Sequence, residues 1–197
     1  MIEEVLTFWF GENPDDAVVA RAQAPLWWSK NSETDNSMRR RFEDQVRAAA
    51  RGERDRWAAT PRGRLALILL LDQFPRNIYR DTARAFACDP RALALSLEGL
   101  DRGADRELRP IERVFFYLPL EHSESPAHQE QSVHCFSHLV ASVPTEQKSV
   151  FDEYLSYAVR HRDIIARFGR FPHRNAILGR ESTPEELAFL AEPGSSF

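Results

Sequence analysis

The chain has 197 residues, of which 43% are hydrophobic and 11% aromatic, and its formal net charge is −4. A chain of this length and apolar content can bury a sizeable core, so we expect one domain that spans residues 1–197. The acidic balance disfavours nucleic acid as a partner, because proteins that bind the phosphate backbone usually present a basic surface.

Signals for export and membrane insertion are missing from the sequence. The first residues carry no basic region ahead of their short apolar run, and no run approaches the roughly 20 apolar residues that cross a bilayer. Cys88 and Cys135 stand far apart and in no Cys-x-x-Cys motif, so they receive no predicted redox role. We therefore expect a cytoplasmic protein without a membrane partner.

Four helix starts are marked by a capping residue that is directly followed by proline. The capping side chain accepts a hydrogen bond from an orphan backbone N–H, and proline has the φ angle of the first helical turn. These pairs are Thr60-Pro61, Asp89-Pro90, Ser125-Pro126 and Thr183-Pro184. Further predicted starts are Asp35, Pro110 and the neighbourhood of Thr145. No alternating apolar and polar run competes as a strand, so we predict an all-α protein with seven or eight helices.

The segment from Leu65 to Leu71 is apolar at seven consecutive positions, which predicts a central helix covered by protein on every face. Asp72 and Gln73 follow at its C-terminal edge, and the phrase Phe74-Pro75-Arg76-Asn77 comes next. An acid at that edge opposes the helix dipole unless a cation lies close. We therefore expect Arg76, four residues on, to pair with Asp72 and to hold a phenylalanine-proline turn.

A further helix is predicted over residues 126–142, and its projection turns Gln129 inward with the apolar residues. The same projection turns Glu130, His134 and His138 to the opposite side, although their spacing of four would suit a metal ion. We interpret these three residues as a solvated face. The sequence thus predicts no metal site and no cofactor.

A long helix is predicted from about Thr145 to Phe168, with His161 in its apolar stripe. A second copy of the phrase, Phe171-Pro172-His173-Arg174-Asn175, follows directly, and Arg167 and Arg170 precede it. Several cations that converge in a partly dry place need anions. Those anions are either the protein's own acids or a bound molecule.

An acid, a base and a hydroxyl stand side by side in Glu121-His122-Ser123-Glu124. Adjacent residues of a chain rarely face one another, so this group is no catalytic triad by itself. It serves either as a general base for a pocket completed elsewhere or as a helix terminus capped by Ser123 or Ser125. The sequence contains no Walker loop, nucleophile elbow or dinucleotide fingerprint, and no catalytic residue is assigned.

Three stretches of the chain carry a resemblance to a known family. They are Asp72 to Arg80, Tyr117 to Glu124, and Arg167 to Asn175. Together they resemble the bacterial family catalogued as domain of unknown function 924, from Val5 to the ending Pro193-Gly194-Ser195-Ser196-Phe197. That family is similar in fold to tetratricopeptide-like proteins, which implies antiparallel helical pairs stacked in a curved layer with a concave face. No biochemical activity comes with the family name.

The chain departs from the family pattern at two places. Glu121 stands where the family more usually has an apolar residue, and Ser125-Pro126 interrupts what is often a more acidic run. A strict repeat of about 34 residues is not visible either, so the tetratricopeptide likeness concerns helix stacking only.

Three interpretations of the polar residues stay open. In the first, they form a pocket for a small anionic metabolite, and His122, His161 or His173 carries a proton. In the second, the chain is an interaction scaffold whose concave face binds a protein partner, and its candidate anchors are Trp9, Trp27, Trp28 and Trp57. In the third, the charges form a structural network of ion pairs among Asp72, Arg76, Glu121, His122, Arg170 and Arg174.

The first interpretation supplies a set of candidate ligand-binding residues. They are Asp72, Gln73, Arg76, Asn77, His122, Gln129, His161, Arg167, Arg170, His173, Arg174 and Asn175. The arginines would bind phosphate or carboxylate, and the amide side chains would orient it.

Overall fold

The structure is a computed structural model that describes residues 1–195, so Ser196 and Phe197 of the family-like ending lie outside the described residues. All regular secondary structure in this part of the chain is helical, as predicted. The α-helices are α1 (Ile2–Phe10), α2 (Asp16–Trp28), α3 (Ser32–Ala50), α4 (Pro61–Ile68), α5 (Phe74–Ile78), α6 (Asp89–Asp101), α7 (Pro110–Glu121), α8 (Pro126–Ser142), α9 (Lys148–Phe168) and α10 (Pro184–Leu190). Eight of these described helices have eight or more residues, which agrees with the predicted number.

The helices begin close to the predicted positions, but two of the four predicted caps are wrong. Thr60 and Thr183 accept hydrogen bonds from backbone N–H groups of the first helical turn, as expected. Asp89 and Ser125 make no such bond. The carboxylate of Asp89 binds the guanidinium of Arg76 instead, because charge-assisted hydrogen bonds are stronger than a bond to a neutral backbone N–H.

The central segment Leu65–Leu71 is at most 1% exposed at every position, which confirms the predicted buried helix. The expected turn after it is wrong, because the helix continues. One π-helical turn, Leu69–Gln73, joins α4 to α5, and the backbone N–H of Phe74 bonds to the carbonyl of Leu69, five residues back. Pro75 has no N–H for an α-helical bond, and the wider turn lets the helix run past it.

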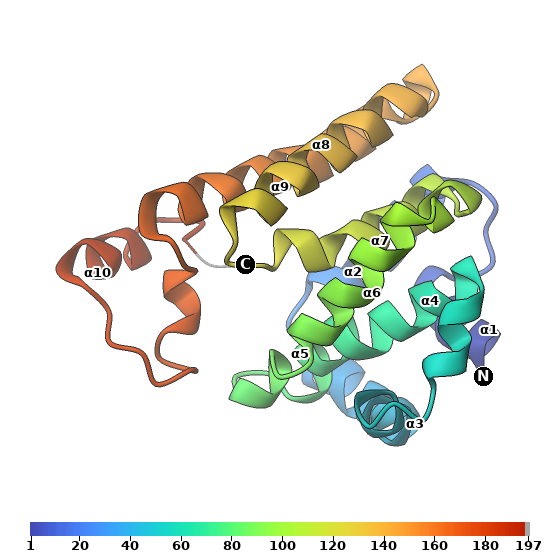
Figure 1. Cartoon of the computed structure of the whole chain (residues 1–197), viewed down its shortest axis with the longest axis horizontal. Helices are drawn as coiled ribbons and strands as arrows, with labels where there is room; N and C mark the ends of the chain where they lie inside the picture. Colours follow the sequence, from blue (N-terminus) through green and yellow to red (C-terminus); the bar gives the residue numbers. More distant parts are fainter. Residues whose placement is uncertain (196–197) are drawn as a thin grey trace.

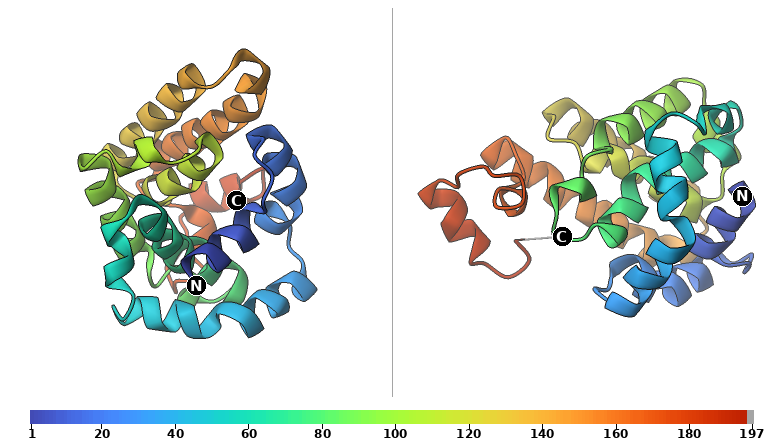
Figure 2. Two further views of the ribbon diagram at one scale, coloured as in Figure 1. Left: turned by 90° about the vertical axis from the view of Figure 1, so that its right-hand side faces the viewer. Right: turned by 90° about the horizontal axis from the view of Figure 1, so that it is seen from below.

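One large apolar core draws buried residues from each of the helices α1 to α9. Helices α8 and α9 run antiparallel along one edge of the molecule, as Figure 1 shows. The chain after α9 extends beyond the end of this bundle and carries α10 at its tip (Figures 1 and 2). A second, smaller apolar cluster holds that extension, and it consists of Ile164, Ile165, Phe168, Phe171 and Phe189.

Within residues 1–195, none of the helices combines the length and the apolar composition that crossing a bilayer requires.

Candidate functional site

The carboxylate of Asp72 has no exposed surface and lies in the π-helical turn beneath the apolar core. Its Oδ1 atom lies 2.7 Å from Nδ1 of His122 and 3.2 Å from Nη1 of Arg76. Its Oδ2 atom accepts a hydrogen bond of 2.6 Å from Gln73. Burial opposes ionisation, yet Arg76 and His122 hold the pKa of Asp72 below its usual value. Asp72 is therefore a buried, fully partnered anion, and its pairing with Arg76 is confirmed.

A second carboxylate, that of Asp89 at the start of α6, joins the two copies of the repeated phrase. Arg76 donates hydrogen bonds of 2.9 and 3.0 Å to its two oxygens, and a further bond of 2.6 Å to the backbone carbonyl of Asp72. Nη1 of Arg174 lies 3.6 Å from Oδ2 of the same carboxylate. Each copy thus delivers one arginine to the same acid. We call the set Asp72, Arg76, Asp89, His122 and Arg174 the central cluster.

Arg174 is 7% exposed and makes one hydrogen bond to the described residues, from Nη1 to the backbone carbonyl of His122 at 3.1 Å. Its Nε atom is buried and has no hydrogen-bond partner in residues 1–195. The guanidinium carbon lies 4.9 Å from the ring centre of Phe86 and 4.6 Å from that of Phe171. Burial, together with repulsion from Arg76, lowers the pKa of Arg174 to about 10. Arg174 is therefore held by aromatic faces and poorly supplied with acceptors.

His122 is the imidazole of the central cluster and directly follows α7. Its Nδ1 atom contacts Asp72, and no hydrogen bond joins its Nε2 atom to another described residue. The side chain is 14% exposed. Burial and Arg76 lower the pKa of His122, against the opposing effect of Asp72, so the ring is neutral at pH 7. A carboxylate that orients one imidazole nitrogen leaves the other available for proton transfer.

A second buried pair, Glu121 and His161, lies beside the central cluster. Oε1 of Glu121 is 3.0 Å from Nδ1 of His161, and the ring centre of His161 is 6.4 Å from that of His122. Burial and the charge of Asp72 raise the pKa of Glu121 to about 8, whereas burial lowers the pKa of His161 to about 3. At neutral pH these groups are thus a protonated carboxyl group and a neutral imidazole.

Asn77 lies outside the central cluster, against an outer ion pair. It donates a hydrogen bond of 3.2 Å to Asp35, and Arg80 binds both oxygens of that carboxylate at 2.7 and 2.8 Å. Asp35 is therefore a partner of these two side chains, and the predicted helix start there is wrong. Helix α3 begins at Ser32, where Asn31 supplies the cap.

Asn175 has the corresponding place in the second copy. It donates a hydrogen bond of 3.3 Å to Glu186, which also accepts hydrogen bonds of 2.6 and 2.8 Å from Arg170. Arg170 lowers the pKa of Glu186 to about 2. A neighbouring pair, Arg180 and Glu124, is joined at 2.8 and 3.0 Å. Arg170 and Asn175 therefore tie the C-terminal extension together, away from the central cluster.

The remaining predicted site residues are spread around the cluster. Gln129 is buried as predicted, and its amide donates to backbone carbonyls of the α7–α8 connection at 2.7 Å. Arg167 is exposed and pairs with Glu185 at 3.0 Å. His173 is half-buried, and burial together with Arg174 lowers its pKa to about 4. Within the described residues, the hydrogen bonds of Gln129 and the ion pair of Arg167 do not involve side chains of the central cluster, whereas His173 is linked to it through the effect of Arg174 on its pKa.

Metal-ligating side chains do not gather in the described chain, where no group of three or more histidine, cysteine or acidic residues could hold an ion. Glu130, His134 and His138 are all exposed, as the helical projection predicts.

Sequence reasoning missed Asp89, which it interpreted as a helix cap, and Phe86, which it did not consider. The signal for an additional acid was the surplus of arginines around the repeated phrase, since buried guanidinium groups need counter-charges. Which acid supplies that counter-charge depends on the start of α6 lying close to Arg76, and that contact is tertiary.

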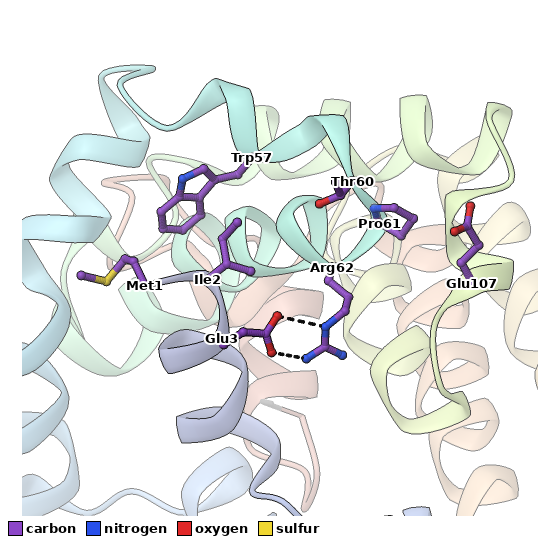
Figure 3. Close-up of a pocket in the computed structure, with 8 residues that line it drawn as sticks. All are labelled: Met1, Ile2, Glu3, Trp57, Thr60, Pro61, Arg62 and Glu107. Atoms are coloured by element: carbon purple, nitrogen blue, oxygen red, sulfur yellow. Dashed lines mark hydrogen bonds and ion pairs between the residues drawn. The ribbon is translucent and has the colours of Figure 1, made fainter.

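A surface pocket of ≈ 820 Å³ lies apart from the central cluster, between the start of α1 and the start of α4. Two of its charged residues are paired with each other, because Arg62 binds both oxygens of Glu3 at 3.2 and 2.6 Å (Figure 3). The lining residues are Met1, Ile2, Glu3, Trp57, Thr60, Pro61, Arg62 and Glu107. This pocket therefore contributes nothing to the site built around Asp72.

Comparison with known proteins relates this chain to proteins described as being of unknown function. The model of a family described as "Bacterial protein of unknown function (DUF924)" matches residues 5–194. The solved structure of a protein of unknown function from Agrobacterium tumefaciens is 40% identical, covers 96% of this chain and 96% of that chain, and has a TM-score of 0.80. The search of curated proteins found no match.

Proposed function

Since the chain belongs to the bacterial family of unknown function DUF924, whose name carries no activity, we propose its function from the geometry of the central cluster. We propose that it binds a small anionic metabolite there, with a carboxylate or a phosphate group as the recognised part. Arg76 and Arg174 supply the positive charge, and Asp89 is the acid that a ligand would partly replace.

The observation that carries this proposal is the poor hydrogen bonding of Arg174. Buried polar groups in folded proteins nearly always have partners, so an exception needs an explanation such as a bound ion or ligand. Arg174 makes one hydrogen bond to the described residues, and its contact with Asp89 at 3.6 Å is longer than a hydrogen bond. A carboxylate or phosphate would supply the missing acceptors in the geometry that a guanidinium prefers.

The π-helical turn supports the same proposal. Such turns inside α-helices occur frequently at functional sites. Here the turn contains Asp72 and Gln73, so the hydrogen bond from Gln73 and the contact with His122 both depend on it.

The test is thermal unfolding of the wild-type chain in the presence of phosphate, acetate and other small phosphorylated and carboxylated compounds. A ligand at 100 times its dissociation constant adds about 2.7 kcal/mol to the free energy of unfolding. For a chain of this size the unfolding midpoint then rises by about 5 to 10 °C. The rise should disappear in Arg174→Ala while the circular dichroism spectrum stays helical.

A matched control is Arg167→Ala, which removes an arginine from the same segment. Arg167 is exposed and pairs with Glu185, outside the central cluster, so its loss should leave the ligand-induced rise of the unfolding midpoint unchanged. Equal rises in the wild type and in Arg174→Ala would contradict the proposal.

A second candidate function is the peptide or protein scaffold that tetratricopeptide-like stacking implies, in the cytoplasm. Trp28 favours it, because this side chain is 51% exposed and lies flat against Phe115 with ring centres 5.8 Å apart. Exposed tryptophans are enriched where proteins bind partners. Trp28→Ala should then weaken a partner complex measured by calorimetry, and unchanged affinity would count against the scaffold.

A further inference from the structure

The charges of the central cluster are balanced before a ligand arrives. Asp72 and Asp89 contribute two carboxylates, Arg76 and Arg174 contribute two guanidinium groups, and His122 is neutral. The side chains are between 0 and 19% exposed. A bound anion therefore introduces one negative charge without a counter-charge into a place with little access to water, which is costly.

His122 is the group placed to supply that counter-charge. The titratable and charged groups that face it from the surrounding elements are Asp72, Arg76, Asp89, Glu121, His161, His173 and Arg174. His122 is in contact with an ionised carboxylate, because Asp72 lies 2.7 Å from its Nδ1 atom. The carboxyl group beside His161 is protonated at neutral pH and offers no such stabilisation.

We infer that an anion binds the central cluster together with one proton, which the Nε2 atom of His122 takes up from solvent. This inference rests on the proposed function and specifies how the site holds its ligand. Nδ1–H continues to donate to Asp72, and the imidazolium balances the charge of the anion. The bound state then has a proton donor next to the ligand, the arrangement that general acid catalysis requires.

The proton uptake makes anion affinity depend on pH in a defined direction. Where His122 is neutral in the free protein and charged in the complex, affinity falls about tenfold for each unit of rising pH. Glu121, with a pKa of about 8, stays mostly protonated in both states below pH 7.5 and contributes little.

The experiment is calorimetric titration with sodium methyl sulfate, an oxyanion of single charge, and, separately, sodium acetate between pH 6.5 and 7.5. Both probes are fully ionised in this range, so protons taken up belong to the protein, which is not true of phosphate. Repeating the titration in buffers with different heats of ionisation gives the number of protons bound per anion. We expect close to one proton for the wild-type chain and about tenfold weaker binding at pH 7.5 than at pH 6.5.

Two variants locate the proton. His122→Asn keeps a donor toward Asp72 but has no titrating nitrogen, so binding should weaken and proton uptake should fall to near zero. Glu121→Gln is the matched control next to it in the chain, and it should keep the uptake.

The possible failures are distinct. Binding of either probe by the wild type without proton uptake overturns this inference and leaves the proposed function standing. Uptake that persists in His122→Asn but vanishes in His173→Gln overturns the assignment to His122. Absence of binding by both probes overturns the proposed function and this inference together. The wild-type titration needs no variant, so the test stands even if His122→Asn does not fold.

Discussion

Phe74-Pro75-Arg76-Asn77 and Phe171-Pro172-His173-Arg174-Asn175 place corresponding residues in corresponding roles, but from different backbones. The first is helical and runs from the π-helical turn into α5, whereas the second is a 3₁₀ turn after Gly169, where a φ of 69° ends α9. In both copies the phenylalanine is fully buried, the arginine reaches Asp89, and the asparagine contacts an outer ion pair.

The copies differ in how their arginines are held. Arg76 donates three hydrogen bonds to Asp72 and Asp89. Burial lowers the pKa of Arg76, but the charges of these two acids outweigh burial and raise that pKa. Arg174 donates one, and its pKa is lowered to about 10. The same residue type is thus held by two acids in the first copy, and makes one hydrogen bond to the described residues in the second. Resemblance between motifs does not establish equal roles.

The largest effect that separates the copies is expected for Arg76→Ala. This change leaves Asp72 buried with only His122 and Gln73, and removing one partner of a buried ion pair costs about 3 to 5 kcal/mol. Urea unfolding followed by circular dichroism measures the loss. Arg84→Ala, at an exposed position close by in the chain, is the control and should change stability little. A loss of unfolding free energy below 1 kcal/mol in Arg76→Ala would contradict a structural role for the first copy.

Glu121 lies at the junction of the copies, since its partner His161 packs against Phe171 with ring centres 5.5 Å apart. Its folded pKa of about 8 exceeds the usual 4.5. Its contribution to stability is therefore fully present below pH 4.5 and is lost as pH rises toward 8. Compared with the wild type, Glu121→Gln should be equally stable at pH 4 and more stable at pH 9, by on the order of 2 to 4 kcal/mol.

Denaturant unfolding at the two pH values checks this expectation, and the difference between them is the informative quantity. His138→Gln, on the exposed face of α8, controls for general changes in charge. A constant difference between Glu121→Gln and the wild type across the range would mean that Glu121 is ionised in the folded chain at neutral pH.

The two asparagines sharpen the comparison with a smaller effect. Asn77→Ala removes one hydrogen bond to a carboxylate that an arginine also binds, so it should cost about 1 to 2 kcal/mol. Asn175→Ala removes such a bond together with hydrogen bonds to Ser182 and Arg180, so its cost should be larger. Thermal unfolding measures both losses, and an Asn175→Ala loss no larger than that of Asn77→Ala would contradict this expectation.

The sequence predicts the parts of the fold that local pattern determines. Leu65–Leu71 is uniformly apolar, and a helix buried on every face needs that composition. Its place in the core can therefore be predicted from this segment alone. Gly169 and Thr183 mark helix ends through backbone conformation and capping, which also depend on adjacent residues.

The candidate site is harder to predict from the sequence, because its contacts join segments that are distant in the chain. The pair Asp72–Arg76 is predictable from a spacing of four, and it is present. The role of Asp89 requires the start of α6 to lie close to Arg76, whereas a local rule assigned that residue to a cap. The π-helical turn also has no sequence pattern of its own apart from Pro75, which is equally compatible with a turn that ends the helix.

The smallest effect on stability is expected for Arg174→Ala, and it is the most informative about function. Its guanidinium group loses solvation on burial, gains one hydrogen bond and retains its contacts with Phe86 and Phe171, so these terms nearly cancel. Thermal unfolding should therefore place this variant within about 1 kcal/mol of the wild type. A loss of stability comparable with that of Arg76→Ala would show that Arg174 also stabilises the fold. A near-neutral change means that folding does not require this buried cation, which leaves ligand binding as the reason for its position.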